Sequence, residues 1–222
     1  MDYLSLIDRL NALDACAVSD ALDTLGVEGV ATGLTRRSTK DKVVGRVQTM
    51  KLSAGLPPEG VKSHLGTQSV EQAAPTDVIV VEQRTGIVAA CWGGVLATAA
   101  MEKSIRGVIV EGPVRDVDEF EDIGLTVFSR SITPRTARGR IHESAVNVGI
   151  EVGEVHVEPG DLVIADGTGV VFVPAAMAEE VITVAERVAA RERLITDAVK
   201  SGEPVTVVMG RDYETMLGTQ EN

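Results

Sequence analysis

The sequence predicts a mixed α/β fold, built as one continuous domain over residues 1–222 with a mixed central sheet and flanking helices. Segments typical of strands and of helices alternate between about residues 77 and 129, which indicates an α/β layer. Residues 141–173 are instead rich in Val and Gly, a composition typical of short strands joined by hairpins. This change of pattern argues against a purely doubly wound sheet.

The first 26 residues are expected to form two helices. Leu4, Ile7 and Leu10 recur at three-residue steps, which is helical spacing. Ser19 is expected to cap the start of the second helix, and Gly26 is expected to end it.

A longer amphipathic helix is expected at the other end of the chain, over about residues 175–200. It would begin after Pro174 and end before Gly202. Its apolar face carries Val181, Val184, Val188, Ile195 and Val199.

The central part predicts a succession of short elements. Runs of β-branched residues bounded by turn residues indicate buried strands, and Ala-rich or polar stretches between them indicate helices. The sequence Glu111-Gly112-Pro113 is expected to end one strand in a turn. The expected strands are 43–52, 77–81, 87–92, 107–110 and 125–129, and the expected helices are 65–73, 95–105 and 116–123.

Composition and charge narrow the class of protein. A net charge of −12 disfavours a general nucleic-acid binder, because phosphate contacts need a basic surface, but it allows an anionic metabolite in a local cationic pocket. No stretch approaches the ~20 apolar residues of a membrane span, and the N-terminus is too charged for a signal peptide, so a cytoplasmic protein is expected. Cys16 and Cys91 match no metal spacing and are expected to be reduced core thiols rather than a disulfide.

Several familiar catalytic patterns are missing from the sequence. It has no Walker A loop and no Gly-x-Ser-x-Gly elbow, and Gly167-Thr168-Gly169 lacks the third glycine of a dinucleotide fingerprint. His64, His142 and His156 share no ligand spacing and are expected to be structural or surface residues. A covalent amine mechanism needs a lysine buried in an apolar site. Most of the lysines lie in polar or boundary positions and only Lys51 is inside an apolar strand, so this mechanism is not expected.

Two features remain as candidate sites, and the first is a glycine loop. In Trp92-Gly93-Gly94-Val95-Leu96-Ala97, an expected strand runs into two glycines and then a helix. Glycine lets a ligand approach the backbone, and the free N–H groups of a helix start suit a carboxylate or phosphate. A simple tight strand-to-helix turn explains the same residues equally well.

The second feature is Arg115-Asp116, just past the C-terminal end of an expected buried strand, where ligand sites in α/β sheets gather. The planar guanidinium of Arg115 could bind a carboxylate or a carbonyl oxygen through its N–H groups. Asp116 could bind Mg²⁺, which takes few protein carboxylates and keeps waters and substrate oxygens. Taken alone, the pair is better explained as surface residues, with Asp116 capping a helix.

The two features gain weight if their strands are neighbours. Together they would grip the 1-carboxylate and the 2-oxo group of a 2-oxo acid. A divalent metal chelated by those oxygens would stabilise the enolate left when a bond to C3 breaks. Retro-aldol cleavage and oxaloacetate decarboxylation share that step.

These motifs resemble the central signature of the RraA-like family. The likeness rests on Gly93-Gly94-x-x-Ala97 and on Arg106 to Gly112 followed by x-x-Arg115-Asp116, and it covers about residues 20–210. Flanking segments that share it are 18–22, 44–49, 157–166 and 169–174. The family includes 4-hydroxy-4-methyl-2-oxoglutarate / 4-carboxy-4-hydroxy-2-oxoadipate aldolases and regulators of ribonuclease E.

The resemblance implies a swivelling β/β/α-type domain that assembles as a homotrimer or as a dimer of trimers (a homohexamer), with sites between subunits. By motif position, it implies that Arg115 contacts the pyruvyl group, that Asp116 binds Mg²⁺, Mn²⁺ or another divalent metal, and that Gly93 to Leu96 supply N–H groups to the carboxylate. The implied activity is a metal-dependent, class II type aldol cleavage that releases pyruvate from a 4-hydroxy-2-oxo acid, with oxaloacetate decarboxylase activity beside it. The acid or base for the aldol hydroxyl is left open between a side chain and a metal-bound water.

One residue departs from the family's pattern, because Glu111 stands where Asp usually precedes the glycine. This puts in doubt any supporting contact of Glu111 with the site. A distal carboxylate of the substrate could be reached by Arg130, Arg135, Arg138 and Arg140. A solvated or subunit-contacting loop is the favoured interpretation of that arginine-rich segment.

Two alternatives to this enzyme are considered. One is a non-catalytic protein that binds and inhibits a ribonuclease, and the other is a family member that acts on another 2-oxo acid. The intact Arg115-Asp116 pair favours an enzyme, because a docking surface does not need it.

Overall fold

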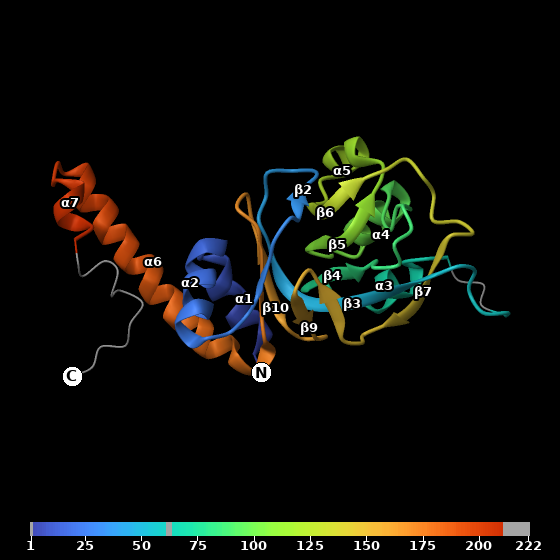
Figure 1. The fold of residues 1–222 in the computed structure, drawn as a ribbon, viewed down its shortest axis with the longest axis horizontal. Coiled ribbons are helices and arrows are strands. Elements are labelled where there is room, and N and C mark those ends of the chain that lie inside the picture. The colour runs from blue at the N-terminus through green and yellow to red at the C-terminus, as the bar shows by residue number, and fades with distance from the viewer. Residues whose placement is uncertain (1, 61–63, 211–222) are drawn as a thin grey trace.

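A mixed sheet forms the centre of the protein (Figure 1). The computed structural model describes residues 2–60 and 64–210. Their nine-stranded sheet has the order β1-β11-β10-β3-β4-β5-β6-β2, with β7 also paired to β3. The pairings from β3 to β6 are parallel, and the others are antiparallel. This confirms the predicted fold class, a single mixed α/β domain with flanking helices.

The sheet curls until its two edges come close. Its strands are β1 (Val30–Ala31), β2 (Thr35–Arg36), β3 (Val43–Ala54), β4 (Asp77–Glu82), β5 (Gly107–Val114), β6 (Val127–Ile132), β7 (Ile141–Val146), β10 (Leu162–Ala165) and β11 (Val170–Val173). Although β1 and β2 lie at opposite edges, only residues 32–34 separate them in sequence. A linker this short reaches about 10 Å, so the edges must be near one another.

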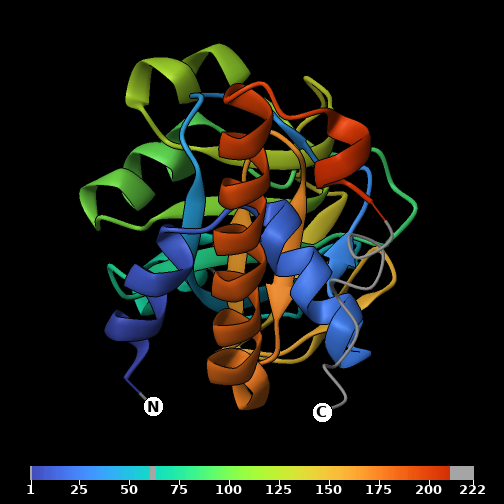
Figure 2. The same cartoon turned by 90° about the vertical axis from the view of Figure 1, so that its left-hand side faces the viewer.

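Helices cover one face of the sheet in two groups. α1 (Tyr3–Asn11), α2 (Ala15–Leu25) and α6 (Ala178–Lys200) pack near β10 and β11, and Figure 2 shows α6 between α1 and α2. α3 (Thr67–Gln72), α4 (Gly94–Glu102) and α5 (Val117–Ile123) pack on β3 to β6. A 3₁₀ turn (Ala175–Met177) lies before α6, and α7 (Val205–Val208) lies after it. The far end of α6 and α7 project from the body of the domain (Figure 1).

Four local predictions are corrected by the structure. α2 begins earlier than expected, because the side chain of Asp14 accepts the N–H of Ala17 and caps the helix there. Ser19 therefore lies inside the helix. Gly26 ends the helix as predicted, in the left-handed conformation. Cys16 is exposed rather than in the core, while Cys91 is buried, and both thiols are free.

The other two corrections concern the centre. Residues 87–92 are largely buried but form no strand, because their hydrogen bonds are isolated: Ala90 donates to the carbonyl of Arg135 in a loop, and Cys91 donates to the carbonyl of Pro113 near the end of β5. β5 does not end at Val110; it continues through Pro113 to Val114 with a shift of register against β6. A bulge accommodates Pro113, which has no N–H to donate.

The face opposite the helices is filled by a small hairpin, β8 (Ile150–Val152) and β9 (Val155–Val157). At the rim of this face a row of charged side chains crosses four strands. Lys51, Glu82 and Glu111 stand at paired positions on β3, β4 and β5, and Arg130 follows on β6. The Nζ of Lys51 lies 3.2 Å from the Oε1 of Glu82, and the Nε of Arg130 lies 2.8 Å from the Oε1 of Glu111.

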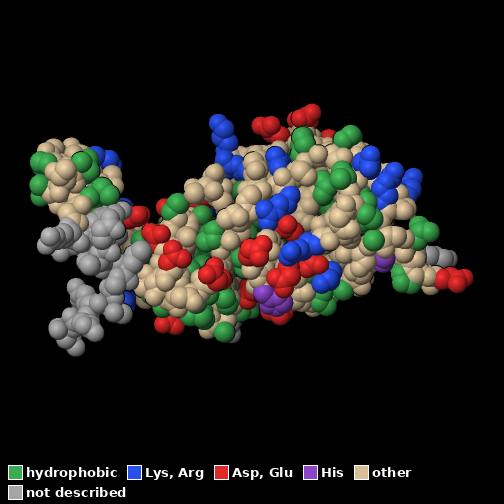
Figure 3. Space-filling view, viewed as in Figure 1, with side chains coloured by type: hydrophobic (Ala, Val, Ile, Leu, Met, Phe, Trp, Pro, Cys, Tyr) green, Lys and Arg blue, Asp and Glu red, His purple; other side chains and the backbone are tan. Residues whose placement is uncertain are grey.

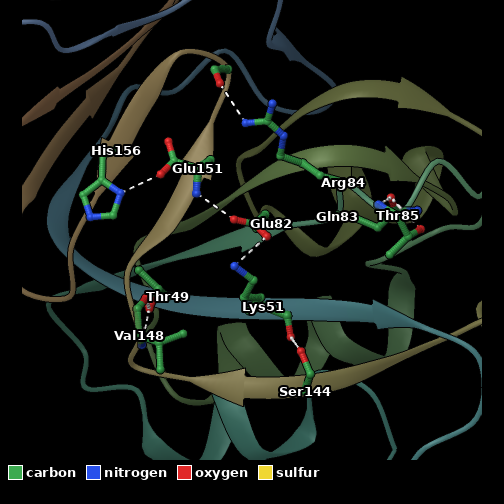
Figure 4. Close-up of polar contacts among 11 residues, drawn as sticks. Thr49, Lys51, Glu82, Gln83, Arg84, Thr85, Ser144, Val148, Glu151 and His156 are labelled. Atoms are coloured by element: carbon green, nitrogen blue, oxygen red, sulfur yellow. Dashed lines mark hydrogen bonds and ion pairs between the residues drawn. The ribbon is translucent and has the colours of Figure 1, made fainter.

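The carboxylates of this row hold the hairpin by its backbone. Glu82 accepts the N–H of Glu151 at 2.7 Å (Figure 4). Glu111 accepts the N–H of Gly153 at 2.9 Å. Arg84 donates to the carbonyl of Gly153 at 3.0 Å. Hydrogen bonds to charged groups are stronger than neutral ones, so these contacts fix the hairpin on the sheet.

Within the described part of the chain, no helix combines the length and the apolar character that crossing a bilayer requires.

We predict that Glu111→Gln lowers the free energy of unfolding by about 1–3 kcal/mol, because it leaves the charge of Arg130 without its partner. Urea unfolding would measure the loss. Glu121→Gln, on the exposed side of α5, is the matched control and should change stability by less than about 0.5 kcal/mol. Equal stabilities of the two variants would contradict the role of the row.

Candidate active site

A hollow of about 100 Å³ lies beyond the C-terminal ends of β4 and β5, beside the start of α4. Its walls come from four segments, which are His64-Leu65, residues 90–96, Arg115-Asp116 and residues 136–138. Both features that the sequence analysis singled out therefore line one pocket. Its small volume suits a metabolite of few atoms.

Neighbouring elements bring the two features together. β4 and β5 are adjacent and parallel, so the segments that follow them emerge at the same edge of the sheet. Beyond the strands, the N–H of Cys91 donates to Pro113 at 2.8 Å, and the N–H of Arg115 donates to Trp92 at 3.1 Å. These bonds set the glycine loop directly against Arg115.

The Asp116 carboxylate joins the two segments. Its Oδ2 accepts the N–H of Gly94 at 3.0 Å and lies 3.3 Å from the Nε of Arg115. Asp116 thus caps a helix, as the simpler interpretation of the sequence proposed, but the helix is α4; toward α5 it makes no capping hydrogen bond. The Arg115 and Asp116 side chains are 42% and 31% exposed, so both remain open to the pocket.

Asp116 has a left-handed backbone, with φ of 58° and ψ of 40°. This conformation costs most residues about 1–2 kcal/mol, whereas Asp, Asn and Gly tolerate it better. Here it places the carboxylate against α4 rather than over the first turn of α5. Non-glycine residues held this way concentrate at functional sites.

Gly93 and Gly94 make room for charged side chains of the same chain. A Cβ at Gly93 would lie 2.6 Å from the Oδ2 of Asp116 and 3.2 Å from the Nε of Arg115. A Cβ at Gly94 would lie 1.7 Å from the Oε2 of Glu119. The glycines therefore admit Arg115, Asp116 and Glu119, where the sequence analysis expected them to admit a ligand.

The start of α4 keeps two backbone donors available. Asp116 takes the N–H of Gly94, but the N–H groups of Val95 and Leu96 make no hydrogen bond to any described residue. The first N–H groups of a helix lack internal partners and sit at the positive end of its dipole, so they favour an anion.

The pocket fits a hard cation with few protein ligands. No group of three or more His, Cys, Asp or Glu able to hold a metal occurs among residues 2–60 and 64–210, which argues against a zinc-type cage there. Asp116 offers an oxygen, Oδ1, that accepts no hydrogen bond from the described residues. One carboxylate beside an open, polar pocket is a donor set that Mg²⁺ uses with waters and substrate oxygens.

Several pocket residues were missed from sequence. His64 lies far from the motifs in the chain and gave no signal. Arg138 belongs to the arginine-rich segment that the sequence analysis considered for a distal carboxylate, and of its four arginines Arg138 is the one that lines the pocket. Glu119 does not line the pocket but lies beside Gly94, and because it follows Asp116 by three residues, helical spacing could have indicated it. Cys91 lines the pocket, but burial raises the pKa of its thiol, which therefore stays protonated and is a poor nucleophile.

Other candidate residues lie elsewhere. Glu111 binds Arg130 and the hairpin and is not among the pocket residues, so the expected contact of Glu111 with the site is not made. Arg130 is thereby also engaged away from the pocket. Arg140 donates to the carbonyls of Thr136 and Arg138 at 3.1 and 3.4 Å, and Arg135 does not line the pocket.

The fold and the site define a class: a mixed α/β domain whose pocket, at the carboxyl ends of parallel strands, is lined by an Arg-Asp pair and by the start of a helix. Residues 15–172 match the RraA-like family, described as Aldolase/RraA, and the chain belongs to that family.

Two relatives illustrate its range. Protein DlpA of Legionella pneumophila is 28% identical over 200 residues, which cover 89% of this chain but 32% of DlpA, so the chain spans about a third of that relative. The 4-hydroxy-4-methyl-2-oxoglutarate aldolase of Thermus thermophilus is 28% identical over 155 residues, covering 69% of this chain and 90% of the relative.

Solved structures share the fold. An uncharacterized protein from Pseudomonas syringae pv. tomato has a TM-score of 0.83 and 28% identity, covering 93% of this chain and 98% of its own. Streptomyces coelicolor RraAS2, described as an unusual member of the RNase ES inhibitor RraA protein family, has a TM-score of 0.77 and 26% identity, covering 86% and 94%.

We predict that the free energy of unfolding of Asp116→Ala is about 1–2 kcal/mol lower than that of Asp116→Gly, because only alanine is strained in the left-handed conformation. Both variants lose the carboxylate, so their difference in urea unfolding isolates the backbone cost. An alanine variant as stable as the glycine variant would show that residue 116 is not held in this conformation.

Proposed function

We propose that this chain is a divalent-metal-dependent lyase that cleaves the C3–C4 bond of a 4-hydroxy-2-oxo acid and releases pyruvate. The observation that carries the proposal is the meeting of Arg115, Asp116 and the available N–H groups of Val95 and Leu96 in one pocket. The aldolase of Thermus thermophilus, a relative at 28% identity, supports the reaction class.

Each part of the pocket has a distinct role in binding the substrate. The Nε of Arg115 is held by Asp116, which leaves the terminal nitrogens of the guanidinium for the 2-oxo oxygen and the adjoining carboxylate. The N–H groups of Val95 and Leu96 receive the other oxygen of that carboxylate. Binding by both walls orients C2 and C3 against Asp116.

Cleavage converts the C4 hydroxyl into a carbonyl. A base, either a side chain or a bound water, takes the proton of the C4 hydroxyl, whose oxygen forms the new C4=O bond as the C3–C4 bond breaks. The electron pair of that bond forms C2=C3 of the pyruvate enolate, which then takes a proton at C3, and the fragment with the new carbonyl leaves as the second product. Arg115 stands beside the oxygen that gains charge. A divalent cation held by Asp116 would supply the Lewis acid for that oxygen. Oxaloacetate loses CO₂ through the same enolate, so decarboxylase activity is part of the proposal.

A trimer or a dimer of trimers is also part of the proposal. The projecting end of the chain supports subunit contact, because Leu194 on α6 and Val207 on α7 are 71% and 67% exposed. Exposed apolar side chains in such number favour a protein interface.

The assay couples pyruvate release to lactate dehydrogenase, with 4-hydroxy-4-methyl-2-oxoglutarate and oxaloacetate as substrates, in Mg²⁺ and in EDTA. Asp116→Asn is the best variant, because asparagine tolerates the left-handed backbone and keeps the shape of the side chain. We predict a loss of at least about 100-fold in kcat. Asp118→Asn, exposed on α5 two residues away, should retain wild-type rates.

Turnover that survives EDTA would remove the metal from the proposal. Wild-type rates in Asp116→Asn would remove the carboxylate. No pyruvate from either substrate would instead favour a protein that binds and inhibits a ribonuclease, or another 2-oxo acid as substrate.

A further inference from the structure

The proposed cleavage needs a base for the C4 hydroxyl, and few side chains of the pocket can serve. Among the described pocket walls, the side chains that can take up a proton are those of His64, Cys91 and Asp116. Burial raises the pKa of the Cys91 thiol, so this group is already protonated. The Asp116 carboxylate is engaged by the N–H of Gly94 and by Arg115, and in the proposed function it also holds the cation. His64 is the side chain that remains.

The hydrogen bond of the His64 ring determines which nitrogen can act as a base. Its Nδ1 lies 3.0 Å from the carbonyl oxygen of Leu65. A carbonyl only accepts hydrogen bonds, so the neutral ring carries its hydrogen on Nδ1 and its lone pair on Nε2. Nε2 has no hydrogen-bond partner within residues 2–60 and 64–210, and the residue lines the pocket. The lone pair of Nε2 is therefore available to a ligand.

Backbone contacts hold His64 in the pocket wall. Its carbonyl accepts the hydroxyl of Thr67 at 2.7 Å and the N–H of Thr67 at 3.2 Å. Two residues further on, the N–H of Gly66 donates to the Oε2 of Glu143 on β7 at 2.9 Å. Gly66 also packs closely on α4, because a Cβ there would lie 2.6 Å from the Cδ1 of Leu96. The segment that carries His64 is thus tied to α3, α4 and β7.

The size of the pocket brings His64 within reach of a substrate. A ligand that fills a hollow of about 100 Å³ contacts its walls on every side. The chain has three histidines, and Figure 3 shows histidine side chains at separate places on one face. Neither His142 nor His156 lines the pocket, so no second imidazole from the described residues competes with His64 there.

We infer that His64 is the general base that takes the proton of the C4 hydroxyl, and this inference rests on the proposed function. As Nε2 takes the proton, the O–H electrons form the second bond of the C4 carbonyl. The electron pair of the C3–C4 bond forms C2=C3, and the carbonyl electrons at C2 move to its oxygen. The ring then returns the proton to C3 of the enolate, so the step needs no further reactant.

Two substrates separate a base from the rest of the site. Cleavage of 4-hydroxy-4-methyl-2-oxoglutarate requires loss of the hydroxyl proton, whereas oxaloacetate loses CO₂ and gives the same enolate with no such proton to remove. His64→Asn is the informative variant, because its amide N–H can keep the bond to the Leu65 carbonyl but offers no base in place of Nε2. His142→Asn is the matched control, since the Nδ1 of His142 makes the same kind of bond to the carbonyl of Gly55, at 3.2 Å and outside the pocket.

We predict that His64→Asn lowers kcat for the hydroxy acid by at least about 100-fold and changes the rate with oxaloacetate by less than about threefold. His142→Asn should keep both rates. His64→Ala leaves room for a free ring, so added imidazole should raise its rate with the hydroxy acid by at least about tenfold.

Wild-type cleavage of the hydroxy acid by His64→Asn would overturn the inference and leave the proposed function standing. An equal loss of both activities would also overturn it, because a role that both substrates need is not that of a base for the hydroxyl. A wild type that releases no pyruvate from the hydroxy acid would overturn the proposed aldol cleavage and this inference together.

Discussion

The hydrogen bond from the N–H of Gly94 to the carboxylate of Asp116 is the contact on which the geometry of the site depends. It joins the start of α4 to the turn that follows β5. The contact requires a residue without a Cβ at position 93 and a left-handed backbone at position 116. In return, it leaves Arg115 and the next two N–H groups of α4 available on the pocket side. A capping interaction and a ligand site are thus built from the same carboxylate.

A second carboxylate on the same strand serves the opposite face of the sheet. Glu111 and Asp116 are five residues apart, yet Glu111 belongs to the charged row that holds the β8–β9 hairpin. Glu111 lies within β5, whereas Asp116 follows the last residue of that strand, Val114, and its left-handed backbone directs the carboxylate toward α4. The chain therefore separates a structural anion from a ligand-binding one within a single strand and its following turn.

Much of the fold was predictable because local patterns report burial. The alternation of apolar runs gave the α/β layer, and the amphipathic spacing gave α6. Residues 87–92 show the limit: their apolar character correctly indicated burial, but their hydrogen-bond partners, Pro113 and Arg135, are distant in sequence and no local pattern reveals them. The Gly93-Gly94 and Arg115-Asp116 pairs could be predicted as site candidates. The place of Arg138 in the pocket wall could not, because long-range backbone bonds such as that from Ala90 to Arg135 position its segment.

The left-handed turn at Asp116 restricts how this position can diversify among related proteins. Only aspartate, asparagine and glycine enter that conformation at low cost, and aspartate alone among them carries a charge. Under the proposed function, a lineage that lost the metal chemistry while keeping the fold would accordingly carry asparagine or glycine here. Catalytic and non-catalytic members of such a family would then be separable at one position, by a change that leaves the architecture around it intact.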